Sequence, residues 1–563
     1  MKSSVLSFAA SLALQYIGVA QAGVIGPSSP TVSIKNGTVH GIKDHVWNQD
    51  YFLGIPYALP PVGSLRFRPP HYINTTLRNI NAKQYGVHCY GYGADQDGFT
   101  QSEDCLTINI VRPAGISHHA KLPVALWIHG GGFREGGGPD LRYNMSFMVD
   151  QSKKINLPII GITFNYRLSG WGFLSGSEVE GTQNLNIGLK DQRLAMHWVN
   201  ENIKAFGGDP DKVTIFGESA GGASVGMQQY AFNGRDDRLF RATIQQSGSP
   251  IYWGPMKSPK DFQAEFNAVA VAAGCADKPS PLNCLREAPV AVLNTIFPDQ
   301  FWQPVLDGRF LTEYGSQALK NGRYVKVPTI VGATSDEGAS FGAIGAHNDG
   351  HITAYFATAS SWSSATIQEL LNSYPADVSI PPAENFTGLD DGTSLPENGA
   401  AYHRAAAIVG DYMFIANRRH TAEILTSQNV PVWSFRFRAV PNGMEPYSGS
   451  GHFSEVGFVF HNLKGDGYDG PYDNGNPLGG PKEAEFAGLA DYVCRSWIRF
   501  IAHRDPRVGT SNSDLKWVPY GHGAGKRQIV FDIISTGGSY IETDDFRYDG
   551  IEHIKKHVLQ TQR

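Results

Sequence analysis

Short apolar runs rich in β-branched residues recur along this chain and are separated by turns of glycine and proline. The runs at 124–128, 159–165 and 213–216 each have the length of one buried strand. Between the second and the third, residues 191–206 place Leu194, Trp198 and Ile203 at helical spacing, and a Gly-Gly-Asp-Pro turn follows. Strands that alternate with helices predict an α/β fold built on a parallel sheet with right-handed crossovers.

The same pattern indicates further elements on both sides of this block. We expect strands at 31–39 and 51–53, a turn that runs into a strand at 102–110, and a return to the sheet at 435–437. Residues 401–425 and 486–501 have the periodicity of helices. The segment 52–70 holds five prolines, so we expect it to be irregular and to wrap the surface or line a cleft.

A G-x-S-x-G turn directly follows the apolar run at 213–216. Gly217 and Gly221 flank Ser219, and small residues then open what should be a helix. This layout is that of a nucleophile elbow, in which a sharp turn holds the serine hydroxyl out toward substrate. A glycine-rich turn that merely carries a serine is the alternative reading.

Three glycines, 130–132, follow the apolar run at 124–128 and precede Phe133. Backbone N–H groups left uncovered after a buried strand suit an oxyanion-binding loop. A flexible linker is the alternative, but linkers rarely adjoin a buried strand and an aromatic residue.

Composition narrows the class of protein. Of the 563 residues, 41% are hydrophobic and 18% are charged, and the net charge of -5 offers no polycationic surface for nucleic acid or anionic lipid. Residues 1–22 combine Lys2, a short apolar core and the small-x-small ending Ala20-Gln21-Ala22, which predicts a signal peptide. We exclude a stable membrane anchor because this core contains Gln15 and no later stretch offers about 20 apolar residues. The expected location is extracellular, or associated with the secretory pathway or the cell wall.

A secreted protein passes through an oxidising compartment, where disulfides form and glycans are added. Cys89 with Cys105, and Cys275 with Cys284, each bracket a short loop, and we predict both pairs as disulfides. Cys494 is left over on an apolar helical stripe, where a buried thiol is expected. Candidate glycosylation sites are Asn36, Asn74, Asn144 and Asn385.

Several of these motifs together resemble the type-B carboxylesterase/lipase family, which includes cholinesterases and secreted fungal esterases and lipases. The resemblance rests on residues 52–70 and on the stretches SEDCLTINI, HGGGF, FGGDP and FGESAGG. It implies an α/β-hydrolase fold with a large, mostly parallel sheet, helices on both faces and a triad in the order Ser, acid, His. We therefore expect one catalytic domain over 23–563, with a helical cap at about 342–430.

The resemblance also implies the partners of Ser219. The family's acid corresponds to Glu337 in the sequence Ser335-Asp336-Glu337-Gly338, with Asp336 as the local alternative. Ten histidines follow Glu337, and His452 in the sequence GSGHFSE resembles the family's histidine loop. The rivals are His461, which comes after the next apolar run, and His403 and His420, which fall in a predicted helix. Glu218 corresponds to a buried supporting carboxylate.

The predicted reaction is ester hydrolysis through an acyl-enzyme on Ser219. His452 takes the serine proton, Glu337 orients the imidazole, and the N–H groups of Gly131, Gly132 and Ala220 bind the oxyanion. Activity should fall as the pH drops through about 6 to 7, the ordinary range of histidine. We expect no cofactor and no metal, since the sequence lacks H-E-x-x-H, spaced cysteine pairs and a P-loop.

Other functions stay open at this stage. They are an inactive adhesion or binding relative, and a transferase that passes the acyl group to another alcohol.

The substrate class is predicted from the loop closed by the first disulfide. In the fungal lipases of the family that this chain resembles, that loop is a long amphipathic lid. Here only fifteen residues lie between Cys89 and Cys105, and most are polar or glycine. We therefore expect soluble esters, including esters or lactones of secondary metabolites, rather than triglycerides or sterol esters. The sequence leaves the oligomeric state open.

Overall fold

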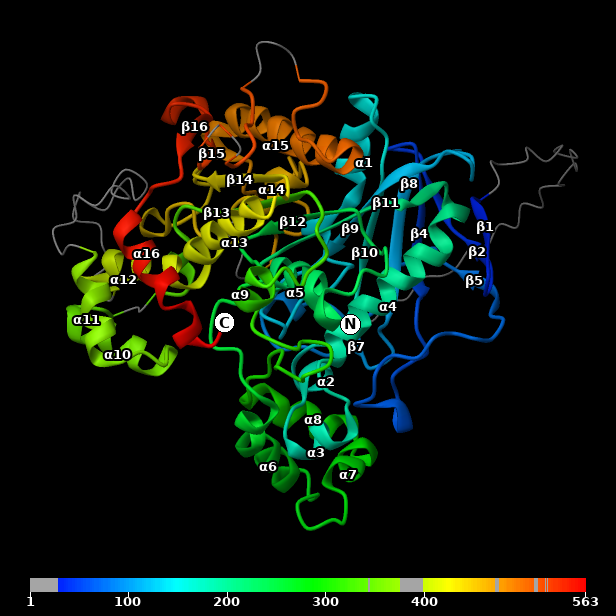
Figure 1. The fold of residues 1–563 in the computed structure, drawn as a ribbon. Helices are drawn as coiled ribbons and strands as arrows, with labels where there is room; N and C mark the ends of the chain where they lie inside the picture. The colour runs from blue at the N-terminus through cyan, green and yellow to red at the C-terminus, as the bar shows by residue number, and fades with distance from the viewer. Residues whose placement is uncertain are drawn as a thin grey trace, which may run out of the picture.

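An eleven-stranded sheet forms the centre of the molecule in a computed structural model (Figure 1). The structure describes residues 29–342, 345–374, 398–470, 475–510, 515–521, 523 and 525–563. The signal peptide predicted at 1–22 and the sequon at Asn385 lie outside these residues. In spatial order the strands are β16 (Tyr540–Thr543), β15 (Arg527–Phe531), β14 (Val432–Phe437), β13 (Thr329–Thr334), β12 (Ala242–Gln246), β11 (Gly208–Glu218), β9 (Leu122–Ile128), β10 (Ile160–Phe164), β8 (Thr107–Pro113), β4 (Gln49–Pro56) and β3 (Ile42–Asp44).

The strands from β10 to β15 pair in parallel, and antiparallel strands complete both edges. The structure thus has the α/β-hydrolase architecture that the sequence predicts. The helices are α1 (Met145–Lys154), α2 (Ser169–Phe173), α3 (Ser177–Thr182), α4 (Ile187–Asn202), α5 (Ala220–Gly234), α6 (Gln263–Ala272), α7 (Pro281–Glu287), α8 (Val290–Ile296), α9 (Gly315–Lys320), α10 (Asp349–Ala359), α11 (Ser364–Asn372), α12 (Tyr402–Gly410), α13 (Ala416–Ser427), α14 (Val456–Val459), α15 (Glu483–His503) and α16 (Tyr548–Lys556).

Alternation along the central strands supplies one core on each face of the sheet. On β9, Leu126 and Ile128 point into the core under α4 and α5, whereas Trp127 points into the core under α1 and α15. Figure 1 shows α1 and α15 on the opposite side of the sheet from α4 and α5. Because both faces are covered, the central strands read as continuous apolar runs.

Some predicted boundaries were wrong. The proline-rich segment contributes to the regular strand β4 as far as Pro56, where an edge-side strand tolerates the missing N–H. The helix expected from residue 191 begins at Ile187, and its last turn, Ile203–Phe206, is a 3₁₀ helix. The helix expected over 401–425 is split into α12 and α13 by the π-helical turn Asp411–Ile415.

A smaller apolar core lies beside the sheet. It joins α10, α11 and α12 to the C-terminal helix α16, and Phe356, Leu370 and Ile551 are among its buried side chains. Figure 1 shows these helices grouped together at one end of the molecule. The strands β1 (Thr31–Ile34), β2 (Gly37–His40) and β5 (Arg78–Asn81) form a separate sheet, and β6 (His88–Cys89) pairs with β7 (Gln101–Ser102).

Candidate active site

Ser219 stands in a strained turn between β11 and α5. Its backbone adopts φ 56° and ψ −122°, a conformation that L-residues rarely occupy. A Cβ at Gly217 would lie 2.6 Å from the carbonyl oxygen of Ile128, and one at Gly221 only 2.0 Å from it. The two glycines of the motif are therefore required by the close approach of this turn to β9.

The glycine loop after β9 lies beside this turn. Gly131 and Gly132 have positive φ, of 83° and 63°, and both line the same cavity as Ser219. The carbonyl of Gly131 accepts hydrogen bonds from the N–H groups of Arg134 and Glu135, which folds the loop back on itself. Among the described residues, the N–H groups of Gly131, Gly132 and Ala220 donate to no protein acceptor.

Glu337 and His452 meet at the same edge of the sheet. Glu337 follows β13, and His452 lies in the loop after β14, so both belong to carboxyl ends of parallel strands. His452 Nδ1 is 2.6 Å from Glu337 Oε2. Glu337 Oε1 in turn accepts from the Ser247 hydroxyl at 2.6 Å and from the Thr334 N–H at 2.8 Å. These contacts fix the carboxylate of Glu337 against the imidazole.

The other imidazole nitrogen faces a second carboxylate. His452 Nε2 lies 3.1 Å from Glu218 Oε1, and the Glu218 side chain is 1% exposed. Within the described chain His452 Nε2 makes no hydrogen bond, so it is bonded neither to Glu218 nor to the Ser219 hydroxyl. The imidazole is thus hydrogen-bonded to Glu337 on one side and lies beside the carboxylate of Glu218 on the other.

This arrangement changes the acidity of the groups involved. Burial alone would lower the pKa of His452, but the carboxylates of Glu218 and Glu337 outweigh burial and raise it to about 9. Burial also raises the pKa of Glu218 well above its ordinary value, although His452 opposes this. Near neutral pH the proton is consequently shared between His452 and these carboxyl groups.

Aromatic side chains line the cavity next to Ser219 and His452. Ser219 and His452 open into a cavity of about 540 Å³, and the His452 ring lies 4.9 Å from that of Phe341 and 4.8 Å from that of Phe414. The other apolar residues that line the cavity are Tyr143, Trp253, Phe301, Met413 and Phe453. Charged groups lie on its wall too, namely Asp95, Arg134, Glu135 and Arg142.

Two further carboxyl groups lie near His452: Glu455, to which the sequence analysis gave no role, and Asp336, the alternative acid, which bonds the histidine loop instead of the imidazole. Glu455 is buried and accepts from the Gln246 amide at 3.1 Å, and its pKa is raised to about 7, chiefly by burial. Asp336 accepts from the Ser450 N–H at 2.8 Å and so ties the histidine loop to the end of β13; burial raises its pKa to about 7. Glu455 is in the very segment that identifies His452, and a glutamate in that position was the available signal.

The rival histidines lie elsewhere. His461 is paired with Asp491 at 2.8 Å, and His403 and His420 lie in α12 and α13. None of the three lines the cavity.

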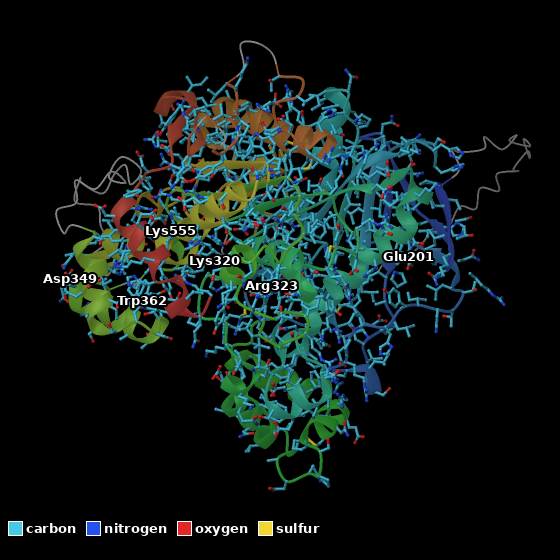
Figure 2. The ribbon with its side chains drawn as sticks, viewed as in Figure 1. Glu201, Lys320, Arg323, Asp349, Trp362 and Lys555 are labelled. Atoms are coloured by element: carbon cyan, nitrogen blue, oxygen red, sulfur yellow. A yellow bond between two sulfur atoms is a disulfide. The ribbon has the colours of Figure 1, made fainter. Side chains whose placement is uncertain are left out.

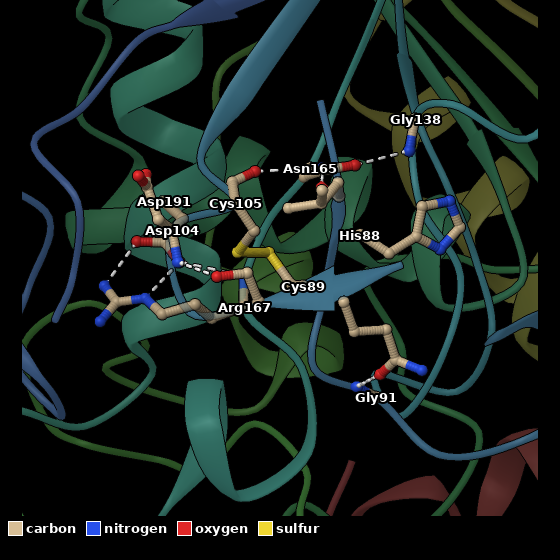
Figure 3. Close-up of a disulfide and its surroundings, with 12 residues drawn as sticks. His88, Cys89, Gly91, Asp104, Cys105, Gly138, Asn165, Arg167 and Asp191 are labelled. Atoms are coloured by element: carbon tan, nitrogen blue, oxygen red, sulfur yellow. Dashed lines mark hydrogen bonds and ion pairs between the residues drawn. A yellow bond between two sulfur atoms is a disulfide. The ribbon is translucent and has the colours of Figure 1, made fainter. Parts of the chain in front are cut away.

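The cysteines pair as the sequence indicates. Disulfides join Cys89 to Cys105 and Cys275 to Cys284, and Cys494 is buried and unpaired. Figure 3 shows the first disulfide beside Asn165, whose amide donates to the Cys105 carbonyl and accepts from the Gly138 N–H. The disulfide closes the 89–105 loop, and the hydrogen bond from Asn165 ties this loop to the end of β10.

Three candidate glycan acceptors differ in their surroundings. Asn74 is exposed, whereas the Asn36 amide donates to the carbonyls of Ile73 and Thr75. Asn144 caps α1 by accepting from the Ser146 N–H at 3.0 Å. The side chains of Asn36 and Asn144 are thus committed to the protein.

Known proteins share this fold and sequence. Residues 28–539 match the carboxylesterase family. The chain is 33% identical to Secreted lipase 1 of Botryotinia fuckeliana, covering 94% of this chain and 93% of that one, and 30% identical to Lipase 1 of Geotrichum candidum, covering 95% and 97%. Among solved structures, Aspergillus niger EstA superimposes with a TM-score of 0.81 at 27% identity, covering 95% of this chain and 99% of its own. Among the described residues no helix has the length and apolarity needed to cross a membrane.

Proposed function

Because the chain belongs to the carboxylesterase family and is a carboxylic ester hydrolase, we propose that it cleaves soluble esters through an acyl-enzyme on Ser219. The observation that carries this proposal is the cavity of about 540 Å³ that Ser219 and His452 share. Its size is that of pockets which enclose one small ligand.

In the proposed reaction, His452 Nε2 leaves Glu218 and accepts the proton of Ser219 as the hydroxyl oxygen attacks the ester carbonyl. The imidazolium then gives that proton to the departing alcohol, and water repeats the sequence to release the acid. Glu337, 2.6 Å from Nδ1, holds the ring in position and stabilises its charged form. Glu218, 3.1 Å from Nε2, stabilises the same charge and is a supporting residue.

Gly131, Gly132 and Ala220 are the proposed oxyanion donors. Their N–H groups are uncommitted, and Gly131 and Gly132 line the cavity with Ser219. Donors already in place around a developing negative charge lower its energy without having to reorganise.

We propose short or medium acyl chains because of the loop between Cys89 and Cys105. Its exposed residues are Gly93, Ala94, Asp97, Gly98, Thr100 and Asp104, and its one helical turn, Ala94–Gln96, is a 3₁₀ helix. Such a loop presents little apolar surface to a lipid droplet.

A triglyceride lipase is the second candidate, and specific observations favour it. Relatives from Botryotinia fuckeliana and Geotrichum candidum carry the name lipase. Phe301 is 52% exposed and Phe341 is 38% exposed, and both belong to the cavity wall. Two exposed aromatic rings there could contact a lipid surface.

A rate profile over p-nitrophenyl esters of increasing acyl length, taken below and above the solubility limit, separates the two candidates. We expect the highest kcat/KM for soluble short or medium esters and no rise in rate on emulsions. The Ser219→Ala protein measures the background hydrolysis. A jump in rate on emulsified long-chain ester would replace this proposal with the lipase.

The comparisons favour an extracellular protein, and we propose secretion after cleavage near Ala22. Relatives named as secreted lipases and two disulfides support this.

We also propose that residues 23–563 form one catalytic domain whose cap includes residues 342–430. Met413 and Phe414, from the π-helical turn in that region, belong to the cavity wall.

A further inference from the structure

A cluster of two histidines and one glutamate lies away from the cavity, where α11 meets α16. His553 is on α16, His557 is at its C-terminal cap, and Glu369 is on α11. One possible ligand atom from each of the three residues lies within 4.8 Å of the others. None of the three lines the cavity around Ser219.

The two imidazoles are one helical turn apart, so they project from the same side of α16. Their ring centroids are 4.3 Å apart. Trp362 packs edge-on against both rings, with centroids at 5.9 Å from His553 and 6.2 Å from His557. Figure 2 shows Trp362 in this group of helices, close to the C-terminal helix that carries Lys555. Packing against the indole limits the rotation of both rings.

Hydrogen bonds to the backbone fix which nitrogen of each ring carries the proton. His553 Nε2 is 3.1 Å from the Thr366 carbonyl oxygen, and His557 Nδ1 is 2.8 Å from the His553 carbonyl oxygen. A carbonyl oxygen only accepts, so each of these nitrogens donates an N–H. This leaves a lone pair on His553 Nδ1 and on His557 Nε2. Histidines that bind metals commonly donate their second N–H to a carbonyl in this way.

The electrostatic surroundings also suit a cation. Glu369 is exposed and contributes a carboxylate to the cluster. Lys556 acts in the opposite direction, since its charge disfavours a second cation nearby. A neutral imidazole and a carboxylate are the forms in which these side chains bind metals.

We propose that Glu369, His553 and His557 bind a divalent transition metal ion, with Zn²⁺ as the best match. Two histidines and one carboxylate form a common zinc ligand set, with water as the fourth ligand. Bonds of about 2.0–2.1 Å place tetrahedral ligands about 3.3 Å apart. A separation of up to 4.8 Å must therefore close by up to about 1.5 Å, which a change of rotamer of the exposed Glu369 can supply.

Such an ion would join α11 to α16 and so stabilise the C-terminal segment. That segment continues to Arg563, whose guanidinium lies 3.9 Å from the centroid of the Tyr412 ring and donates to the Trp253 carbonyl at 3.3 Å. Trp253 is a wall of the cavity. The ion has a structural role, distant from the reacting ester.

Titration of the full-length protein with ZnCl₂ after EDTA treatment and dialysis tests the proposal, with calorimetry and thermal unfolding as readouts. We expect one site of 1:1 stoichiometry and a rise in Tm on saturation, with ester turnover unchanged by EDTA. Co²⁺ in the same site should show the visible absorption of a tetrahedral complex.

Glu369→Gln is the decisive variant because the residue is exposed and the change preserves its shape. It should weaken Zn²⁺ binding at least about tenfold, and His553→Asn/His557→Asn should abolish the site. Two controls match these variants. Glu552→Gln removes the neighbouring acid of α16, and His118→Asn/His119→Asn removes an exposed histidine pair whose rings are 3.8 Å apart. Both controls should bind as the parent does.

The proposal fails if the parent protein binds no Zn²⁺, or if Glu369→Gln and the controls have equal affinities. Should the double histidine variant not fold, Glu369→Gln still decides the question.

Discussion

Replacement of Glu218 by glutamine should move the pH dependence of ester hydrolysis. Glu218 Oε1 is 3.1 Å from His452 Nε2, and its charge raises the pKa of His452 more than the charge of Glu337 does, although Glu337 adds a hydrogen bond. Since only the neutral imidazole can act as the base, kcat/KM should increase as the pH rises toward about 9. The range of about 6 to 7 expected from the sequence lacked the contribution of these carboxylates.

The size of the shift follows from the surroundings of His452. Its pKa is raised from 6.5 to about 9, by about 2.5 units, even though burial acts in the opposite direction. Glu337 and Glu455 remain in Glu218→Gln and account for part of the rise. Removal of the Glu218 charge should therefore move the acidic limb of the pH–rate profile down by about 1 to 2 pH units.

The acidic limb of the pH–rate profile can be measured from initial rates on a soluble p-nitrophenyl ester between pH 5 and 10. The rates must be corrected for spontaneous hydrolysis. Asp491→Asn is a suitable control, because Asp491 is paired with His461, outside the cavity. Its limb should coincide with that of the parent enzyme. An unchanged acidic limb in Glu218→Gln would refute the assignment of Glu218 as a carboxylate that raises the pKa of His452.

Four further changes give independent tests. Ser219→Ala should lower kcat at least about a thousandfold and leave Tm unchanged; substantial remaining turnover would exclude Ser219 as the nucleophile. Cys89→Ala/Cys105→Ala should lower the free energy of unfolding by about 2–3 kcal/mol in denaturant titrations, since the disulfide closes a loop with a sequence separation of 16 residues, and an unchanged midpoint would contradict this. Asp544→Asn should cost about 3–5 kcal/mol because it leaves the buried Arg418 and Arg419 without their partner. Although burial acts to raise the pKa of Asp544, these arginines depress it, so this stabilisation is present above the ordinary Asp range and is lost as the pH falls below it. Asn74→Gln should remove one glycan from the secreted protein by mass spectrometry, whereas Asn36→Gln should remove none, because Asn36 bonds the backbone.

Local sequence patterns were sufficient for the parts of the fold in which one element follows another. The apolar run before Gly217 and the glycines around Ser219 predict the strand, turn and helix that the structure contains. Chain order and the family resemblance identified Glu337 and His452, which the structure brings within 2.6 Å of each other. The turn at Ser219 is predictable from local sequence because sterics within a few residues determine it, whereas Glu337 and His452 were found through the resemblance.

Contacts between distant segments were not predictable in the same way. The rotation of His452 Nε2 toward Glu218 depends on two residues that are far apart in the chain. The π-helical turn that places Phe414 beside His452 has no signal in a pattern of helical periodicity. The spacing of His553 and His557 was visible in the sequence, but the position of Glu369 beside them depends on the packing of α11 against α16.

The number of buried carboxyl groups around His452 limits how many of them can be negatively charged in the resting enzyme. Glu218, Glu337 and Glu455 are all buried, and one imidazolium can balance only one negative charge. Burial raises the pKa of both Glu218 and Glu455, so protons are shared among these groups near neutral pH. When Ser219 transfers its proton, the new positive charge on His452 forms between carboxylates that are already in place. The charges of these carboxylates, and not their burial, therefore make the charged imidazole of the proposed reaction easier to form.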